Sequence, residues 1–127
     1  MKKANSSNAL NLEELLLSCP MLHGLQLLSG RYKVGLLWHI HLQHNRFGVL
    51  KKILHPVTTK MLSQQLRELE ADGLISRTIY AEMPPRVEYA LTSKSAALVT
   101  VLEGLYQWGH QLKEDAVEQA QAAMSST

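Results

Sequence analysis

The chain has 127 residues, 46% of them hydrophobic, and a formal net charge of +2. This length fits one small domain with an extra helix, and so weak a charge does not by itself indicate a nucleic-acid partner. One cysteine excludes an internal disulfide framework and a cysteine-rich zinc site, and no apolar run approaches the roughly 20 residues that cross a membrane. We therefore expect a cytoplasmic protein without a membrane partner.

The charged residues are distributed unevenly along the chain. Between Arg31 and Lys94, ten lysines and arginines stand against five acidic residues. From Ser95 onward, a single lysine stands against four acidic residues. A basic middle followed by an acidic segment indicates an anionic partner for the middle of the chain alone.

Three helices are expected in the N-terminal part of the chain. Residues 1–18 predict an arm that is polar as far as Ala9 and then forms a short amphipathic helix. A second helix should begin at Pro20, since proline is favoured at the first helical position, and end near Gly30. Residues 31–44 predict a third helix that is apolar on most sides, which is typical of the centre of a domain.

Two further segments, residues 46–54 and 58–73, predict short helices joined by a turn, which together make a helix-turn-helix. In the second helix Leu62, Leu66 and Leu69 recur at helical spacing as one narrow apolar stripe. A stripe of this kind packs on a core and leaves the opposite face to solvent or to a partner.

The opposite face of that second helix carries polar and basic groups, and we call it the reading face. Thr58 or Thr59 can cap the helix, and Gly73 can end it. Such groups reach phosphates and base edges in a DNA major groove, although an ordinary solvated helix surface is the alternative. The residues that we assign to the reading face are Thr59, Lys60, Ser63, Gln64 and Arg67.

The next segment predicts a β-hairpin, or wing. Residues 74–80 and 87–91 are rich in β-branched and aromatic types, as strands are. Between them lies the pair Pro84-Pro85, which cannot continue a ladder of hydrogen bonds and so marks the tip. Arg77 and Arg86 flank this tip on its two sides.

A last helix is expected to begin after Thr92 or Ser93 and to reach the final residues, which should be disordered. It is long and its apolar stripe has no core of its own to cover, so we predict that it packs on a second subunit together with the N-terminal helix. The residues assigned to this dimer interface are Leu12, Leu16, Leu98, Leu102, Leu105, Trp108 and Leu112.

These elements predict a mainly α fold with a small β-hairpin wing, of the α+β class. It is a winged helix-turn-helix with N- and C-terminal dimerisation helices. The expected divisions are an N-terminal arm and helix over residues 1–18, the winged helix-turn-helix over 19–92, and a dimerisation helix and tail over 93–127.

Several stretches resemble the HxlR-type family of bacterial winged-helix transcription regulators, which is akin to the MarR type. The matching stretches are Cys19-Pro20, Ser29–Lys33, Arg46–Leu50, Met61–Arg77, Pro84–Thr92 and Leu102–Gly109. The resemblance implies a homodimer, assembled through its terminal helices, that binds operator DNA and usually represses. Among the departures from the family pattern, Ser95 stands where glycine is common.

We therefore expect a dimeric, sequence-specific, DNA-binding transcriptional regulator that acts as a repressor on double-stranded operator DNA. Ser63, Gln64 and Arg67 would read bases, and Lys60 would contact a phosphate. A winged-helix module for protein–protein contact, without specific DNA binding, is the alternative. The wing and backbone residues expected at further phosphates are Arg31, Arg46, Lys51, Arg77 and Arg86.

Cys19 is a candidate sensor for a small reactive effector, such as an oxidant or an electrophile. A thiol at a helix N-terminus is close to unpaired N–H groups, which favour the thiolate. The resemblance implies the same, since redox-responsive members of the family carry a cysteine at this position. A small buried hydrophobic residue is the alternative interpretation.

The remaining titratable residues predict neither a metal site nor a catalytic site. His41 and His44 are expected to share one helix face with His39 elsewhere, and two ligands do not make a site without a third. No catalytic triad, phosphate-binding glycine loop or carboxylate pair is apparent, so we expect no enzyme activity and no cofactor.

Overall fold

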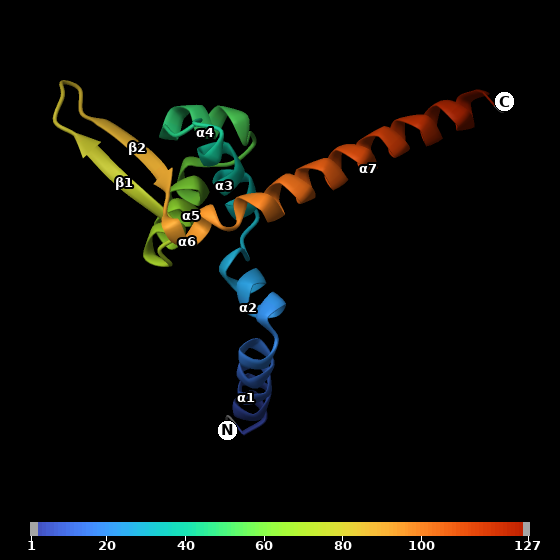
Figure 1. The fold of residues 1–127 in the computed structure, drawn as a ribbon, viewed down its shortest axis with the longest axis horizontal. Helices are drawn as coiled ribbons and strands as arrows, with labels where there is room; N and C mark the ends of the chain where they lie inside the picture. The colour runs from blue at the N-terminus through green and yellow to red at the C-terminus, as the bar shows by residue number, and fades with distance from the viewer. Residues whose placement is uncertain (1–2, 126–127) are drawn as a thin grey trace.

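The computed structural model describes residues 3–125 (Figure 1). Side chains are described from residue 11 onward. A compact winged unit carries two projections, one made by the N-terminal helices and the other by the long last helix (Figure 1). In chain order the elements are α1 (Lys3–Ser18), α2 (Pro20–Leu27), α3 (Lys33–His41), α4 (Phe47–Ile53), α5 (Thr59–Ala71), β1 (Ile75–Tyr80), β2 (Arg86–Leu91), α6 (Ser93–Ala96) and α7 (Val99–Ser125).

The hydrophobic core lies between α3, α4, α5, the base of the hairpin and the start of α7. The apolar stripe of α5 is buried as its spacing predicted, and the central position of α3 is likewise confirmed. Burial of these side chains provides the main favourable contribution to folding of the unit. The core residues are Leu36, Leu37, Ile40, Leu50, Val57, Leu62, Leu66, Leu69, Leu74, Ile75, Tyr89 and Leu102.

Local signals account for the ends of α5. The Thr58 hydroxyl accepts a hydrogen bond from the Met61 N–H at 3.1 Å, so Thr58 is the N-cap. At the other end Gly73 adopts a φ of +75°, a left-handed conformation that glycine takes without strain. Between α4 and α5, Val57 is buried and anchors the turn to the core.

Helix α3 is shorter than the residues 31–44 expected from composition. It begins at Lys33 and ends at His41, and Gln43 then takes a φ of 72°. A left-handed residue cannot continue a right-handed helix, so the chain turns here, and the residues that follow Gln43 are polar. The predicted end of this helix at residue 44 was therefore wrong.

The wing is a two-stranded antiparallel hairpin whose register runs from Ile75 opposite Leu91 to Tyr80 opposite Arg86. Its base is joined to α6 through the buried Ser95 hydroxyl. That hydroxyl donates to the Leu74 carbonyl at 2.6 Å and accepts from the Thr92 N–H at 3.1 Å. A glycine at this position could make neither bond, so the departure from the family pattern strengthens the base of the wing.

The terminal helices differ from expectation in three respects. Helix α1 already begins at Lys3 instead of after a polar arm, and the predicted last helix is divided into α6 and α7, of which α7 reaches Ser125. The disordered end that we expected beyond it lies outside the described residues. Leu102, assigned to the dimer interface, is only 3% exposed and belongs to the core of the winged unit. Leu98 packs against the same core. The reason is that the first two turns of α7 pack on the winged unit, where Leu102 is buried and the Tyr106 ring stacks on Trp38 of α3 at 5.3 Å. No helix within residues 3–125 is long and apolar enough to cross a membrane.

Candidate nucleic-acid interface

The reading face of α5 points away from the core. Thr59, Lys60, Gln64 and Arg67 are exposed and Ser63 is half-buried, while the leucine stripe lies on the opposite side of the same helix. Within residues 3–125, no ion pair or hydrogen bond engages the side chains of Lys60 and Arg67. Both cations are therefore available to a polyanion such as DNA.

A cleft separates α5 from the hairpin and brings part of the reading face beside the wing. Arg67 and Ser63 from α5 and Arg77 from β1 contribute polar groups to it, so three of the predicted DNA contacts, from two separate elements, share one concave surface. The residues that line it are Phe47, Ser63, Leu66, Arg67, Glu70, Arg77 and Tyr89.

The two wing arginines project from opposite faces of the hairpin. Arg77 pairs in register with Tyr89, whose ring is buried against the core, so Arg77 lies on the face that is turned toward α5. Its Nε is 3.6 Å from a carboxylate oxygen of Glu70 on α5. Arg86, three positions nearer the tip on the partner strand, lies on the other face.

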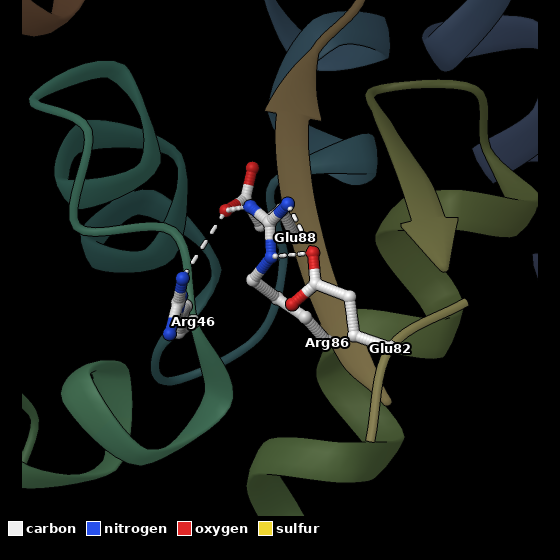
Figure 2. A network of polar contacts seen from close by, with 4 residues as sticks. All are labelled: Arg46, Glu82, Arg86 and Glu88. Carbon is white, nitrogen blue, oxygen red and sulfur yellow. Dashed lines mark hydrogen bonds and ion pairs between the residues drawn. The ribbon is translucent and has the colours of Figure 1, made fainter. Parts of the chain in front are cut away.

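Arg86 belongs to a network that joins the wing to the start of α4 (Figure 2). Its Nε and Nη2 donate to Glu82 at 3.2 and 2.9 Å, and its Nη1 donates to Glu88. The other partner of Glu88 is Arg46, the N-cap residue of α4, at 3.6 Å. The Arg86 guanidinium also lies 3.9 Å from the centre of the Tyr80 ring.

The network is electrically balanced, because it contains two arginines and two glutamates. The hydrogen bond from Arg86 lowers the pKa of Glu82, and the same bond raises the pKa of Arg86, so both remain charged near neutral pH. To contact a phosphate, Arg46 or Arg86 must therefore either bind it while still bonded to its glutamate or release that glutamate.

The other predicted phosphate contacts lie apart from the cleft. Arg31 is exposed in the turn before α3, with its guanidinium 5.8 Å from the centre of the Tyr32 ring. Lys51 is exposed on α4. Neither of them lines the cleft between α5 and the hairpin.

Two buried polar residues behind the reading face were missed from the sequence. Lys33, the first residue of α3, is only 5% exposed and bonds to Glu68 of α5. Gln65 is also buried, and its Oε1 accepts the Tyr32 N–H at 2.9 Å. A lysine at the start of a strongly apolar helix was the available signal, since a buried ammonium requires a partner.

The candidate sensor Cys19 is the N-cap residue of α2, half-buried and with a free thiol. Its side chain makes no capping hydrogen bond. It stands at the junction between α1 and α2, the two helices that project from the winged unit (Figure 1).

The histidines pair differently from the prediction. His39 and His44 approach, with their Nδ1 atoms 3.4 Å apart, because the turn at Gln43 brings His44 back toward α3. Burial first, and then the charge of His44, lower the pKa of His39. His41 instead lies beside Trp38, with the ring centres 5.6 Å apart. In the described part of the chain, no three histidine, cysteine or acidic side chains gather as metal ligands.

Comparison with known proteins identifies the group to which this winged unit belongs. Residues 27–117 match the HxlR-like helix-turn-helix family, which covers α3 to α6 and most of α7. The chain belongs to the HxlR-like family. The recognition made from the sequence motifs and the predicted winged helix-turn-helix fold are thereby confirmed.

Relatives agree with this assignment. The HTH-type transcriptional regulator YdeP of Bacillus subtilis is 38% identical over 105 residues, which are 83% of this chain and 81% of the relative. YtcD, an HTH-type regulator from the same organism, is 42% identical over 85 residues, or 67% of this chain and 68% of the relative. The solved structure of the redox regulator HypR in its oxidized form superposes with a TM-score of 0.68 at 36% identity, covering 73% of this chain and 96% of HypR.

This member of the HxlR-like family is a DNA-binding transcriptional regulator of the helix-turn-helix type, and it is not an enzyme.

Proposed function

We propose that this regulator binds operator DNA as a homodimer and represses transcription, with α5 in the major groove and the wing against the adjacent backbone. The observation that carries the proposal is the exposed reading face of α5, whose two cations have no partner within the described residues and which shares a cleft with Arg77 of the wing. Phosphate contacts would supply much of the DNA affinity, and contacts of Ser63, Gln64 and Arg67 with bases would supply the preference for one operator sequence.

The dimer is supported by apolar surface on the two projections. Leu12 on α1 and Leu105, Trp108 and Leu112 on α7 are between 44% and 61% exposed. Burying such side chains against a second copy is favourable by about 25 cal/mol per Å² of apolar surface, and monomers rarely leave contiguous patches of this kind open. Two copies would then present their α5 helices to half-sites about one helical turn, or ~34–36 Å, apart.

Repression follows from occupancy of the operator. A dimer that contacts two half-sites covers that stretch of the duplex and competes with any other protein that requires it. The resemblance to the HxlR-type family, whose members usually repress, supports this direction of regulation.

The test is selection of bound sequences from a random pool of duplex DNA, followed by titration of the selected site over a range of salt concentrations. Binding should weaken with a log–log slope of roughly −0.9 for each phosphate contacted. Arg67→Ala should lose affinity for the selected site, whereas Lys113→Ala, which removes a cation from α7 outside the winged unit, should not. Failure to select any sequence at low salt would instead favour the protein–protein module.

A response to oxidants or electrophiles through Cys19 is a second element of the proposal, supported by the likeness to a solved redox regulator and by the free thiol beside the projecting helices. With one cysteine per chain, two Cys19 thiols from two protomers would give up two electrons and two protons to an oxidant such as diamide. The products would be an intersubunit disulfide and the reduced hydrazine. Alternatively, the thiolate would add to a quinone as an S-adduct.

Diamide or quinone treatment, followed by intact mass measurement and operator titration, tests this element. We expect a disulfide-linked dimer or an adduct at Cys19 together with altered operator affinity, and neither effect in Cys19→Ser. An unchanged mass at Cys19 and an unchanged affinity would exclude the response.

A further inference from the structure

A buried lysine lies directly behind the reading face of α5. Lys33 Nζ is 2.7 Å from Glu68 Oε1, and the Lys33 side chain is only 7% exposed whereas that of Glu68 is 44% exposed. An ammonium removed from water to this extent requires an anionic partner, so this contact fixes the position of both groups. The pair ties the first turn of α3 to the last turns of α5.

The path of the Lys33 stem is set by a glycine. A Cβ atom built at Gly30 would lie 2.9 Å from both Cγ and Cδ of Lys33, which is closer than van der Waals contact allows. The stem therefore passes over a backbone position that has no side chain, while Glu68 holds its far end. Two independent constraints thus place this ammonium.

The second oxygen of Glu68 contacts a residue of the reading face. Gln64 Nε2 donates to Glu68 Oε2 at 3.2 Å, one helical turn away. The hydrogen bond from Lys33, followed by that from Gln64, lowers the pKa of Glu68, so its carboxylate is ionised near neutral pH and can only accept hydrogen bonds. The Gln64 amide can therefore approach the Glu68 carboxylate only with its Nε2. In the flipped orientation Oε1 of Gln64 would lie against a carboxylate oxygen, and neither atom could donate a hydrogen bond.

We propose that Lys33 and Glu68 are positioning residues that set the base preference of Gln64, holding its amide so that Oε1 and the second N–H face the DNA. This inference rests on the proposed function. In that orientation Oε1 accepts a hydrogen bond from the exocyclic amine of adenine, and the remaining N–H donates to adenine N7. Guanine and thymine present carbonyl oxygens at the corresponding positions and are disfavoured.

The same helix offers a matched control. Glu70 is also a glutamate of α5 and is also paired with a cation, Arg77 at 3.6 Å, yet among the described residues no hydrogen bond joins it to Gln64. A change that merely removes a negative charge from α5 should act similarly at Glu68 and Glu70. A change that releases the Gln64 amide should act only at Glu68.

The experiment uses the full chain and the operator obtained by selection. Gln64→Ala first identifies the base pair at which discrimination is lost, and we then compare the affinity for all four base pairs at that position. The wild type should prefer adenine there by roughly tenfold. Glu68→Ala should reduce that preference to about twofold or less. Glu70→Ala removes the partner of Arg77 and so alters the affinity for all four base pairs alike, but it should retain the preference. Thermal unfolding checks that each variant folds.

Two further variants separate positioning from loss of structure. In the Gln64→Ala background, Glu68→Ala should produce no additional loss of preference at that position. The double replacement Lys33→Met with Glu68→Gln leaves no buried charge without a partner. It also ends the fixed orientation of the Gln64 amide, because the new amide at position 68 can both donate and accept hydrogen bonds. It should therefore fold and yet discriminate as weakly as Glu68→Ala.

The outcomes distinguish this inference from the function on which it rests. A wild-type protein that selects no sequence overturns both. A wild-type preference that Glu68→Ala retains in full overturns the inference alone. The inference is also overturned if Glu68→Ala and Glu70→Ala weaken the preference equally, or if Glu68→Ala lowers affinity uniformly for all four base pairs.

Discussion

The reading face and the wing both carry cations toward the proposed DNA surface, but they hold them in opposite electrostatic states. Lys60 and Arg67 on α5 have no ionic partner within the described residues. Arg46 and Arg86 are already engaged by glutamates (Figure 2). The difference indicates that the two regions contribute differently to binding.

A free cation gains the full attraction of a phosphate and releases counterions from the DNA, whereas a paired one must first give up its carboxylate. The wing network links the hairpin to the start of α4, and so holds the wing in one orientation relative to α5. We therefore expect α5 to supply most of the affinity and the preference, and the wing to supply placement. This division of roles is testable at single residues.

The largest effect is expected at Arg67. Arg67→Ala should cost about 1–3 kcal/mol in binding to the selected site, because a guanidinium that contacts a guanine edge contributes that much discrimination. Binding to unrelated DNA should weaken less. Fluorescence anisotropy with both duplexes measures the two losses, and equal losses would show that Arg67 contacts phosphate only.

The salt dependence of binding should separate the two regions directly. Lys60→Gln should make the log–log slope shallower by roughly 0.9, the value of one phosphate contact. Arg86→Gln should change it by less, since the network it belongs to is neutral overall. Titrations at four or more salt concentrations measure both slopes, and a larger change for Arg86→Gln would reverse the comparison.

Glu82 is the exposed competitor for Arg86 at the wing tip. Glu82→Gln should raise DNA affinity by roughly twofold to fivefold, because it weakens the hold on Nε and Nη2 of Arg86 and removes a negative charge from the wing tip, while Nη1 stays bonded to Glu88. Glu103→Gln on α7 is the control for the change in net charge. A decrease in affinity would mean that Glu82 positions Arg86 for its contact.

The smallest effect is expected in acid. The pKa of Glu82 is lower in the folded protein than the ordinary value of 4.5, through its hydrogen bond with Arg86. The pair therefore stabilises the fold above about pH 4.5 and is lost as the pH falls through the lowered folded-state pKa. Glu82→Gln should make the acid loss of stability slightly shallower in denaturant titrations at successive pH values, and an unchanged profile would show that the exposed pair adds nothing.

Much of the fold could be predicted from the sequence because its signals act over short distances. The stripe of α5, the Thr58 cap, the left-handed Gly73 and the proline-tipped hairpin each depend on neighbours a few residues away, and each is found in the structure. For the same reason the reading face could be assigned, since helical periodicity places its residues opposite the stripe.

Local signals could not predict which parts of the molecule these helix and strand faces pack against. Leu102 and Leu105 belong to one stripe of α7, yet Leu102 enters the core and Leu105 stays exposed. Which of the two leucines is buried depends on where α7 leaves the winged unit, and the helical periodicity of the sequence does not predict that point. Likewise the link from Glu88 to Arg46 joins residues far apart in the chain.

The order of elements as far as the wing, the winged helix-turn-helix and the side chains that α5 presents to solvent could all be predicted from the sequence, whereas the division between α6 and α7 could not. Which cations are already paired with carboxylates, and which residues lie behind the reading face, became apparent from the tertiary structure alone. The physical reason is that local propensity and periodicity act along the chain, whereas burial and ion pairing depend on distances through space. Lys33 and Glu68 illustrate this, because neither belongs to the face whose amide they hold.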